Sequence, residues 1–241
     1  NLQHIDVKRG DITLTGQGLD ASKSDYLSLI ARTAQIDAGL NANETRIVLG
    51  ANQVDATGKV TAQAADSGVK VALDTGALGG MYTNRIKLVS SDKGVGVNVG
   101  NLSARSGDIT LSANGKLSLG DAVAQGTIQA DADALALQGK QQAGEALTLK
   151  ACQDMTLQDA TLRAGQNIEL ASGGGLKAQN SVISAGVDAQ GKVKPANQLS
   201  LKGDGVTLSN TQLAAGKMTI DAGQSLQQDA QSGLRAESVL E

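Results

Sequence analysis

A short cassette recurs along this chain, and it constrains the fold more than any other feature of the sequence. The cassette is a glycine, one or two polar residues and an apolar–polar–apolar triplet, as in Gly10-Asp11-Ile12-Thr13-Leu14 and Gly107-Asp108-Ile109-Thr110-Leu111. The first apolar residues of successive triplets are separated by 19, 19, 21, 31 and 19 residues; they are Ile109, Ile128, Leu147, Ile168, Leu199 and Met218. The chain is therefore built on a repeat of about 20 residues.

Each repeat holds more than one triplet. Between Leu147 and Ile168 lie Met155-Thr156-Leu157 and Leu162-Arg163-Ala164. Alternation of apolar and polar residues predicts strands, and strands this short must stack on those of neighbouring repeats to be stable. We therefore predict an all-β chain, a right-handed parallel β-helix with about 20 residues and three short strands per coil. About twelve coils at strand spacing would form a monomeric rod roughly 55–60 Å long.

The composition fits the thin interior of such a rod. Aromatic residues make up 1 % of the chain, as two Tyr with no Trp or Phe, whereas hydrophobic residues make up 40 %. A compact core normally uses aromatic side chains, but a narrow column of Leu, Ile, Val and Ala has no room for them. The net charge of -3 provides no basic face for nucleic acid. No apolar run approaches the ~18 residues of a membrane span.

Two parts of the chain depart from the repeat. Residues 186–195 lengthen one step to 31 residues and carry the single proline, so we predict a loop that bulges from one coil. The first hundred residues are less regular, and residues 25–36 also fit a short helix by spacing. The alternation of the flanking segments favours strands there. The single cysteine, Cys152, excludes an internal disulfide and is expected to be a small hydrophobe within a strand.

Several of these segments together resemble a known family. Residues 71–82, which end in Leu78-Gly79-Gly80-Met81-Tyr82, and residues 85–89 and 94–97 resemble a block of two-partner secretion exoproteins, the filamentous haemagglutinin and CdiA-type proteins of Gram-negative bacteria. The resemblance is strong over residues 10–103. It implies that residues 1–103 are the C-terminal part of the secretion (haemagglutination activity) domain, and residues 104–241 are filamentous haemagglutinin-type repeats.

The resemblance also implies a location and partners. Proteins of this family leave the cell through an outer-membrane transporter of the Omp85 type and fold as a β-helix on the outer surface. CdiA-type members carry a receptor-binding region and a carboxy-terminal toxin, and haemagglutinin-type members serve adhesion. The Asn-Pro-rich secretion motifs of the family are absent here, and a toxin would lie beyond Glu241. Because the chain begins at Asn1, we expect an internal fragment. Adhesion and toxin delivery both stay open, and the resemblance favours the contact-dependent inhibition type.

No residue pattern predicts a catalytic, cofactor-binding or metal-binding site. His4 is the only histidine and has no Cys, Ser or carboxylate cluster around it in the sequence. Residues 94–100 echo a dinucleotide fingerprint, but no helix pattern follows, so we interpret them as strand and turn. Asp131-Ala132-Asp133 lacks the Gly and Glu of a calcium loop, and Gly173-Gly174-Gly175 is expected to be a turn.

Four further residues could have special roles. Asn43-Glu44-Thr45 and Asn101-Leu102-Ser103 are acceptor sequons; chance occurrence is the default, although some similar adhesins carry sugars there. Tyr26 and Tyr82 are the only aromatic residues, and Tyr82 is expected to close one end of a layer.

Three functions from different classes follow. The favoured one is a non-catalytic shaft of a secreted adhesin or contact-dependent inhibition protein, with receptor contacts made through other regions. An alternative is an adhesin segment that binds a ligand itself, with residues 186–195 as the place to look. The third, a β-helix enzyme that degrades polysaccharides, needs paired carboxylates and aromatic platforms. Carboxylates such as Asp11 and Asp108 lie instead at expected turns.

Overall fold

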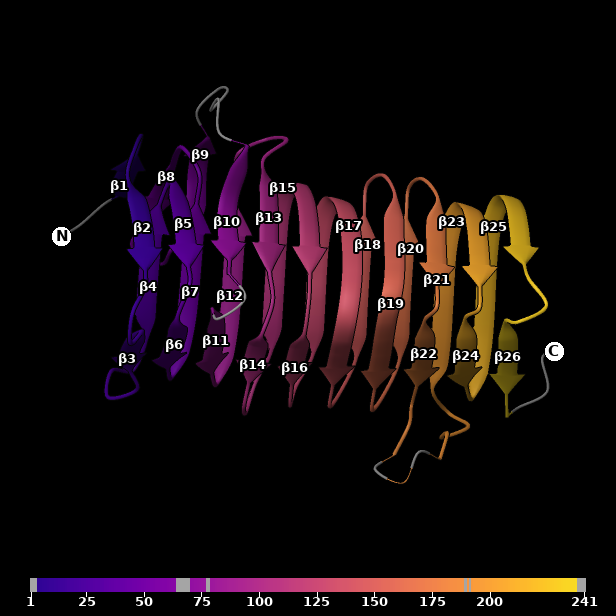
Figure 1. The fold of residues 1–241 in the computed structure, drawn as a ribbon. Helices are drawn as coiled ribbons and strands as arrows, with labels where there is room; N and C mark the ends of the chain where they lie inside the picture. Colours follow the sequence, from indigo (N-terminus) through magenta and orange to yellow (C-terminus); the bar gives the residue numbers. More distant parts are fainter. Residues whose placement is uncertain (1–3, 64–69, 77–78, 189, 191, 238–241) are drawn as a thin grey trace.

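The computed structural model describes residues 4–63, 70–76, 79–188, 190 and 192–237. Every regular element in these ranges is a β-strand, and none of the described residues forms a helix long and apolar enough to cross a membrane. The strands follow one another around a common axis and stack along it from the N-terminal to the C-terminal end (Figure 1). This is the right-handed parallel β-helix that the repeat predicts.

The β-helix has three faces, each a ladder of parallel strands. The first face contains β2 (Asp11–Leu14), β5 (Thr33–Ile36), β10 (Val71–Thr75), β13 (Gly96–Val99), parts of β15 (Ile109–Leu119), β17 (Ile128–Ala143) and β19 (Met155–Ala164), β21 (Leu176–Gln179), and parts of β23 (Gln198–Ser209) and β25 (Lys217–Gln228). The second face contains β3 (Leu19–Ala21), β6 (Gly39–Ala42), β11 (Gly80–Thr83), β14 (Leu102–Ala104), β16 (Ala122–Ala124), the ends of β17 and β19, β22 (Val182–Ala185), β24 (Gln212–Ala215) and β26 (Gly233–Ala236). The third face contains β4 (Leu27–Ala31), β7 (Glu44–Leu49), β12 (Arg85–Ser90), the starts of β15 and β17, β18 (Leu147–Ala151), β20 (Ile168–Ser172) and the starts of β23 and β25.

The repeat markers pair with one another as the spacing predicts. Five of these markers form a fully buried column on the third face together with Ile86, the register partner of Ile109 in the preceding coil. Each member of the column is at most 1 % exposed: Ile86, Ile109, Ile128, Leu147, Ile168 and Leu199. Alternate residues face the solvent, and this inside–outside alternation buries one apolar layer per coil. Burying each Leu or Ile side chain stabilises the fold by about 1.5–3 kcal/mol before chain entropy is counted.

The rod is shorter than the sequence analysis predicts. The first face has ten strands, so the described residues make about ten coils and not twelve. At strand spacing the stack is roughly 45 Å long. The difference arises because two excursions use residues without adding coils. One contains β8 (Asn52–Asp55) and β9 (Val60–Gln63), and the other follows β22.

The excursion after β22 is the loop predicted at residues 186–195, and it projects from the stack in Figure 1. Val187 and Val193 form an antiparallel bridge at its base. The Asp188 carboxylate accepts hydrogen bonds from the backbone N–H of Gln190 (3.0 Å) and Lys192 (2.8 Å), which closes the turn. The chain then re-enters the stack at β23. The strands β4 and β5 lie within residues 25–36, which confirms the prediction of strands over a helix there.

Candidate functional site

A small antiparallel sheet departs from the uniform stack and covers part of the third face. It consists of β8 flanked by β1 (His4–Val7) and β9, and both pairings are antiparallel. Val7 and Val54 of this sheet pack on Val48, which faces outward from β7 and is nevertheless fully buried. Ile30 of β4, one coil away in register, packs against the same cluster. A second small core therefore lies outside the β-helix.

The sequence contains a signal for this outer core. In most strands of the third face, only alternate residues are apolar. Three consecutive apolar residues nevertheless occur at 29–31 and again at 47–49. The middle residue of each run points outward and must be covered. In later coils the same register position holds Ser112, Asp131 and Lys150, which need no cover.

A buried polar cluster anchors the start of the hairpin formed by β8 and β9 to the next coil. The Asp92 side chain is 5 % exposed and lies 3.9 Å from Nε of Arg32. Its Oδ1 also accepts a hydrogen bond from the backbone N–H of Ala51 (2.8 Å). Asn52 Nδ2 donates to Ser91 Oγ (2.8 Å). A buried ion pair adds little net stability, but removing one partner leaves a buried charge uncompensated, so this cluster fixes where the hairpin leaves the stack.

Gly50 is required at the same point. Its φ is +115°, and a Cβ there would lie 2.4 Å from Ser91 Oγ and 2.8 Å from Asp92 Oδ1. Any side chain would therefore displace the polar cluster, in addition to the backbone strain of a positive φ.

The turn of the hairpin is held by its own hydrogen bonds. The Asp55 carboxylate accepts from the backbone N–H of Thr57 (2.8 Å), its hydroxyl (2.7 Å) and the N–H of Lys59 (3.0 Å). The hydrogen bond from the Thr57 hydroxyl is the main reason that the pKa of Asp55 lies below its usual value. The Arg46 guanidinium, on β7, donates to the carbonyl oxygen of Thr57 and ties the turn to the shaft.

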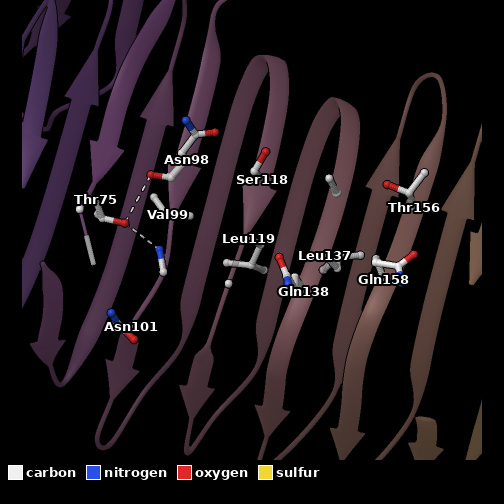
Figure 2. Close-up of a pocket in the computed structure, with 14 residues that line it drawn as sticks. Thr75, Asn98, Val99, Asn101, Ser118, Leu119, Leu137, Gln138, Thr156 and Gln158 are labelled. Atoms are coloured by element: carbon white, nitrogen blue, oxygen red, sulfur yellow. Dashed lines mark hydrogen bonds between the residues drawn. The ribbon is translucent and has the colours of Figure 1, made fainter. Parts of the chain in front are cut away.

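A hollow of about 380 Å³ lies along the edge between the first and second faces (Figure 2). It exists because Gly76, Gly100 and Gly120 occupy one register position in three successive coils. In the next coils Gln138 and Gln158 fill that position.

The side chains that line this groove are all uncharged. Gly100 N–H donates to Thr75 Oγ1 (2.9 Å), as the dashed line in Figure 2 shows. The side chains of Asn98, Ser118 and Gln138 make no hydrogen bond to any described residue. The lining therefore offers hydrogen bonds, but none of its side chains takes up or releases a proton near neutral pH, as general acid–base catalysis requires.

Carboxylates at the turns accept hydrogen bonds from the backbone of the next coil. Asp108 Oδ1 accepts from the backbone N–H of Thr127 (2.7 Å) in the next coil, and this hydrogen bond is the main reason that the pKa of Asp108 is lowered. Asp121 accepts in the same way from Lys140 N–H (2.8 Å). These carboxylates join one coil to the next, which is a structural use of the residues that a polysaccharide-degrading enzyme would need for catalysis.

The singled-out residues are not brought together. His4 begins β1 opposite Asp55, and its side chain lies outside the described part of the chain. Residues 94–100 form a turn and β13, and residues 173–175 form a turn, as predicted. Asp131 lies on β17, and the described residues contain no group of three or more His, Cys, Asp or Glu that could hold a metal ion.

Two expectations about single residues are wrong. Cys152 is exposed in the turn after β18, because the buried alternation ends at Ala151. Tyr82 does not close a layer. It points outward from β11 between its register partners Asn41 and Ser103 and is 39 % exposed.

The two sequons have structural roles. Asn43 Nδ2 donates to the carbonyl oxygens of Ser22 (3.0 Å) and Ser24 (2.9 Å) in the previous coil. Asn101 Nδ2 donates to Gly79 O (3.0 Å). These are the nitrogens that a sugar would modify.

The chain is similar to known secretion and toxin proteins. Residues 1–119 match the family described as the TPS secretion domain. Over 98 % of its length the chain is 44 % identical to a protein named tRNA nuclease CdiA from Yersinia mollaretii, and 39 % identical to one named 16S rRNA endonuclease CdiA from Enterobacter cloacae. A tRNA nuclease CdiA of Escherichia coli strain NC101 is 44 % identical over 69 % of the chain. The match spans 8 % of the first two relatives and 5 % of the third. No solved structure matches the chain.

Proposed function

The chain belongs to the CdiA family of two-partner secretion exoproteins, and from this premise we propose that it is a non-catalytic, β-helical shaft segment of a large secreted exoprotein. In this proposal an Omp85-type outer-membrane transporter carries the protein to the outer surface of a Gram-negative bacterium. The shaft is a monomeric rod that holds distal receptor-binding and toxin regions away from the cell. The nuclease activities in the names of the relatives would belong to such distal regions.

One observation carries the proposal: the stack is continuous along its whole described length. Strands of the third face pair in unbroken register from β4 to β25. Coils that contact only their neighbours form a spacer whose length is set by their number. We further propose that residues 1–103 belong to the secretion domain and residues 104–241 are haemagglutinin-type repeats. The antiparallel sheet β1–β8–β9 lies within the first of these.

The test uses two deletions in the full-length exoprotein, expressed with its transporter. Deletion of residues 1–103 should abolish surface display, because the transporter would lose its recognition region. Deletion of residues 128–146 removes one complete 19-residue coil and preserves the register from Ile109 to Leu147, so it should leave display intact. Display is measured by antibody labelling of whole cells and by protease accessibility. Equal display of both deletions, or display without the transporter, would refute the proposal.

A second candidate function, an adhesin segment that binds a ligand itself, is favoured by the groove of Figure 2. Its free amide and hydroxyl groups suit a neutral, hydroxyl-rich chain such as a glycan. Binding of the purified chain to a neutral-oligosaccharide array, lost on Asn98→Ala and kept on Thr148→Ala, would support it. No binding by the unsubstituted chain would remove it.

A further inference from the structure

We propose that a pocket between the hairpin and the third face binds a carboxylate side chain of the transporter. This inference rests on the proposed function and names a contact within it. The pocket has a volume of about 560 Å³. Its walls come from the loop before β4 (Asp25 and Tyr26), from β7 (Glu44, Thr45 and Arg46), from Ala56 in the hairpin turn, and from β12 (Arg85 and Lys87).

Of the three cations that line the pocket, Arg46 and Lys87 form no ion pair with any described residue, and the lining as a whole has one more cation than it has carboxylates. Arg85 Nη1 lies 3.2 Å from Glu44 Oε1, so these two charges compensate each other. Arg46 donates to the Thr57 carbonyl oxygen, which is a neutral acceptor. Lys87 makes no hydrogen bond or ion pair with any described residue. The hairpin turn therefore positions Arg46 without cancelling its charge.

Arg46 and Lys87 are close because of the register. They are direct partners on the adjacent parallel strands β7 and β12, and both face outward. Their backbones are therefore separated by roughly 4.8 Å. The register partners on either side, Ser28 and Thr110, are neutral. Two cations at this spacing can both approach the two oxygens of one carboxylate.

The other wall of the pocket favours a protein ligand. Tyr26 is 64 % exposed, and a tyrosine ring is a common contact at protein interfaces. Asp25 beside it adds a negative charge. Asp25 disfavours a multiply charged polyphosphate more than a singly charged carboxylate, and a peptide can place a carboxylate at the cations and another kind of group beside Asp25. The pocket lies within residues 1–119, which match the secretion domain, so we assign the peptide to the transporter.

The experiment measures binding of the chain to the detergent-solubilised transporter at two ionic strengths. Lys87→Glu should weaken binding about tenfold at low salt, and Lys87→Gln by a smaller factor. The effect should shrink between about 50 mM and about 500 mM salt, because screening weakens exposed charge pairs. Lys177→Glu is the matched control, since Lys177 is an exposed, unpaired lysine on β21 of the first face. Thermal unfolding of each variant shows whether the fold is kept.

Each outcome of this experiment either supports or overturns the proposed pocket. A loss on Lys87→Glu, with no loss on Lys177→Glu, supports the pocket. Unchanged affinity and salt dependence on Lys87→Glu would overturn the pocket while the proposed function stands. An equal loss with both variants would show a general charge effect and would also overturn it. Lys87-dependent binding to phosphatidylglycerol vesicles in place of the transporter would identify a phosphate ligand and reject the peptide. If the unsubstituted chain does not bind the transporter, transporter recognition falls, and the pocket falls with it.

Discussion

The same substitution should have very different costs in the middle and at the end of one apolar column. Leu135 is 1 % exposed and stacks between Leu117 and Met155, which are both fully buried. Leu226 occupies the equivalent position in the last described coil, is 51 % exposed, and among the described residues has Val206 as its single register partner. Leu135→Ala and Leu226→Ala therefore remove the same atoms from two environments.

The magnitudes follow from burial. Leu135→Ala removes a fully buried side chain and leaves a cavity that coils on both sides cannot fill, so we expect a loss of about 3 kcal/mol in the free energy of unfolding. Half of the Leu226 side chain is already in water and no closed cavity forms, so Leu226→Ala should cost about 1 kcal/mol.

Urea unfolding followed by circular dichroism gives the total change, and native-state hydrogen exchange locates it. Leu135→Ala should lower protection in coils on both sides of β17, whereas Leu226→Ala should loosen only the last coils. Equal losses for the two variants, or a larger loss for Leu226→Ala, would refute the one-dimensional stacking on which this reasoning rests.

Three further outcomes are expected. Gly115→Ala should lower the thermal midpoint by several degrees, because its Cβ would lie 2.1 Å from a carbonyl oxygen of the previous coil. Gly100→Ala should change the midpoint little, because the nearest atom to its Cβ would be 3.9 Å away. Differential scanning calorimetry compares the two variants. Because the pKa of Asp108 is lowered in the folded state, its contribution to stability is complete above the ordinary aspartate pKa of 3.8 and is lost as the pH falls through the folded pKa. Asp108→Asn should therefore reduce the acid sensitivity of unfolding below about pH 4. Urea titrations at a series of pH values measure this effect. Intact mass after incubation of the folded chain with an N-glycosyltransferase should show no sugar on Asn43 or Asn101, and modification without unfolding would contradict the hydrogen bonds assigned to their amides.

The regular part of the fold could be predicted because its period is visible in single residues. The recurring triplet and its spacing predict that Ile109, Ile128 and Leu147 are equivalent, and they are register partners in the structure. Such agreement arises because stacking forces each inward position to repeat once per coil. The same reasoning located the loop at residues 186–195.

The antiparallel sheet could not be predicted in the same way. Residues 52–55 and 60–63 alternate like coil strands, and alternation does not tell whether a strand lies in the stack or on top of it. Its partner β1 lies far away in sequence, and antiparallel pairing of this kind leaves no periodic signal. The polar cluster of Arg32 and Asp92 depends on that placement, so spacing gave no sign of it. Cys152 shows a smaller limit, because one residue of error at the end of a strand exchanges a buried position for an exposed one.

The short distance in sequence between paired strands has a consequence for how the rod is assembled. Most partners are separated by 19 to 23 residues, as Ile86 with Ile109 and Ile109 with Ile128. The chain entropy lost in closing a loop depends on the length of that loop, and folding is faster when contacts are local. Adding one more turn therefore takes the same time on a short rod as on a long one. A polypeptide that emerged slowly from a narrow channel would fold one coil at a time on the far side, and every folded coil would prevent the chain from sliding back.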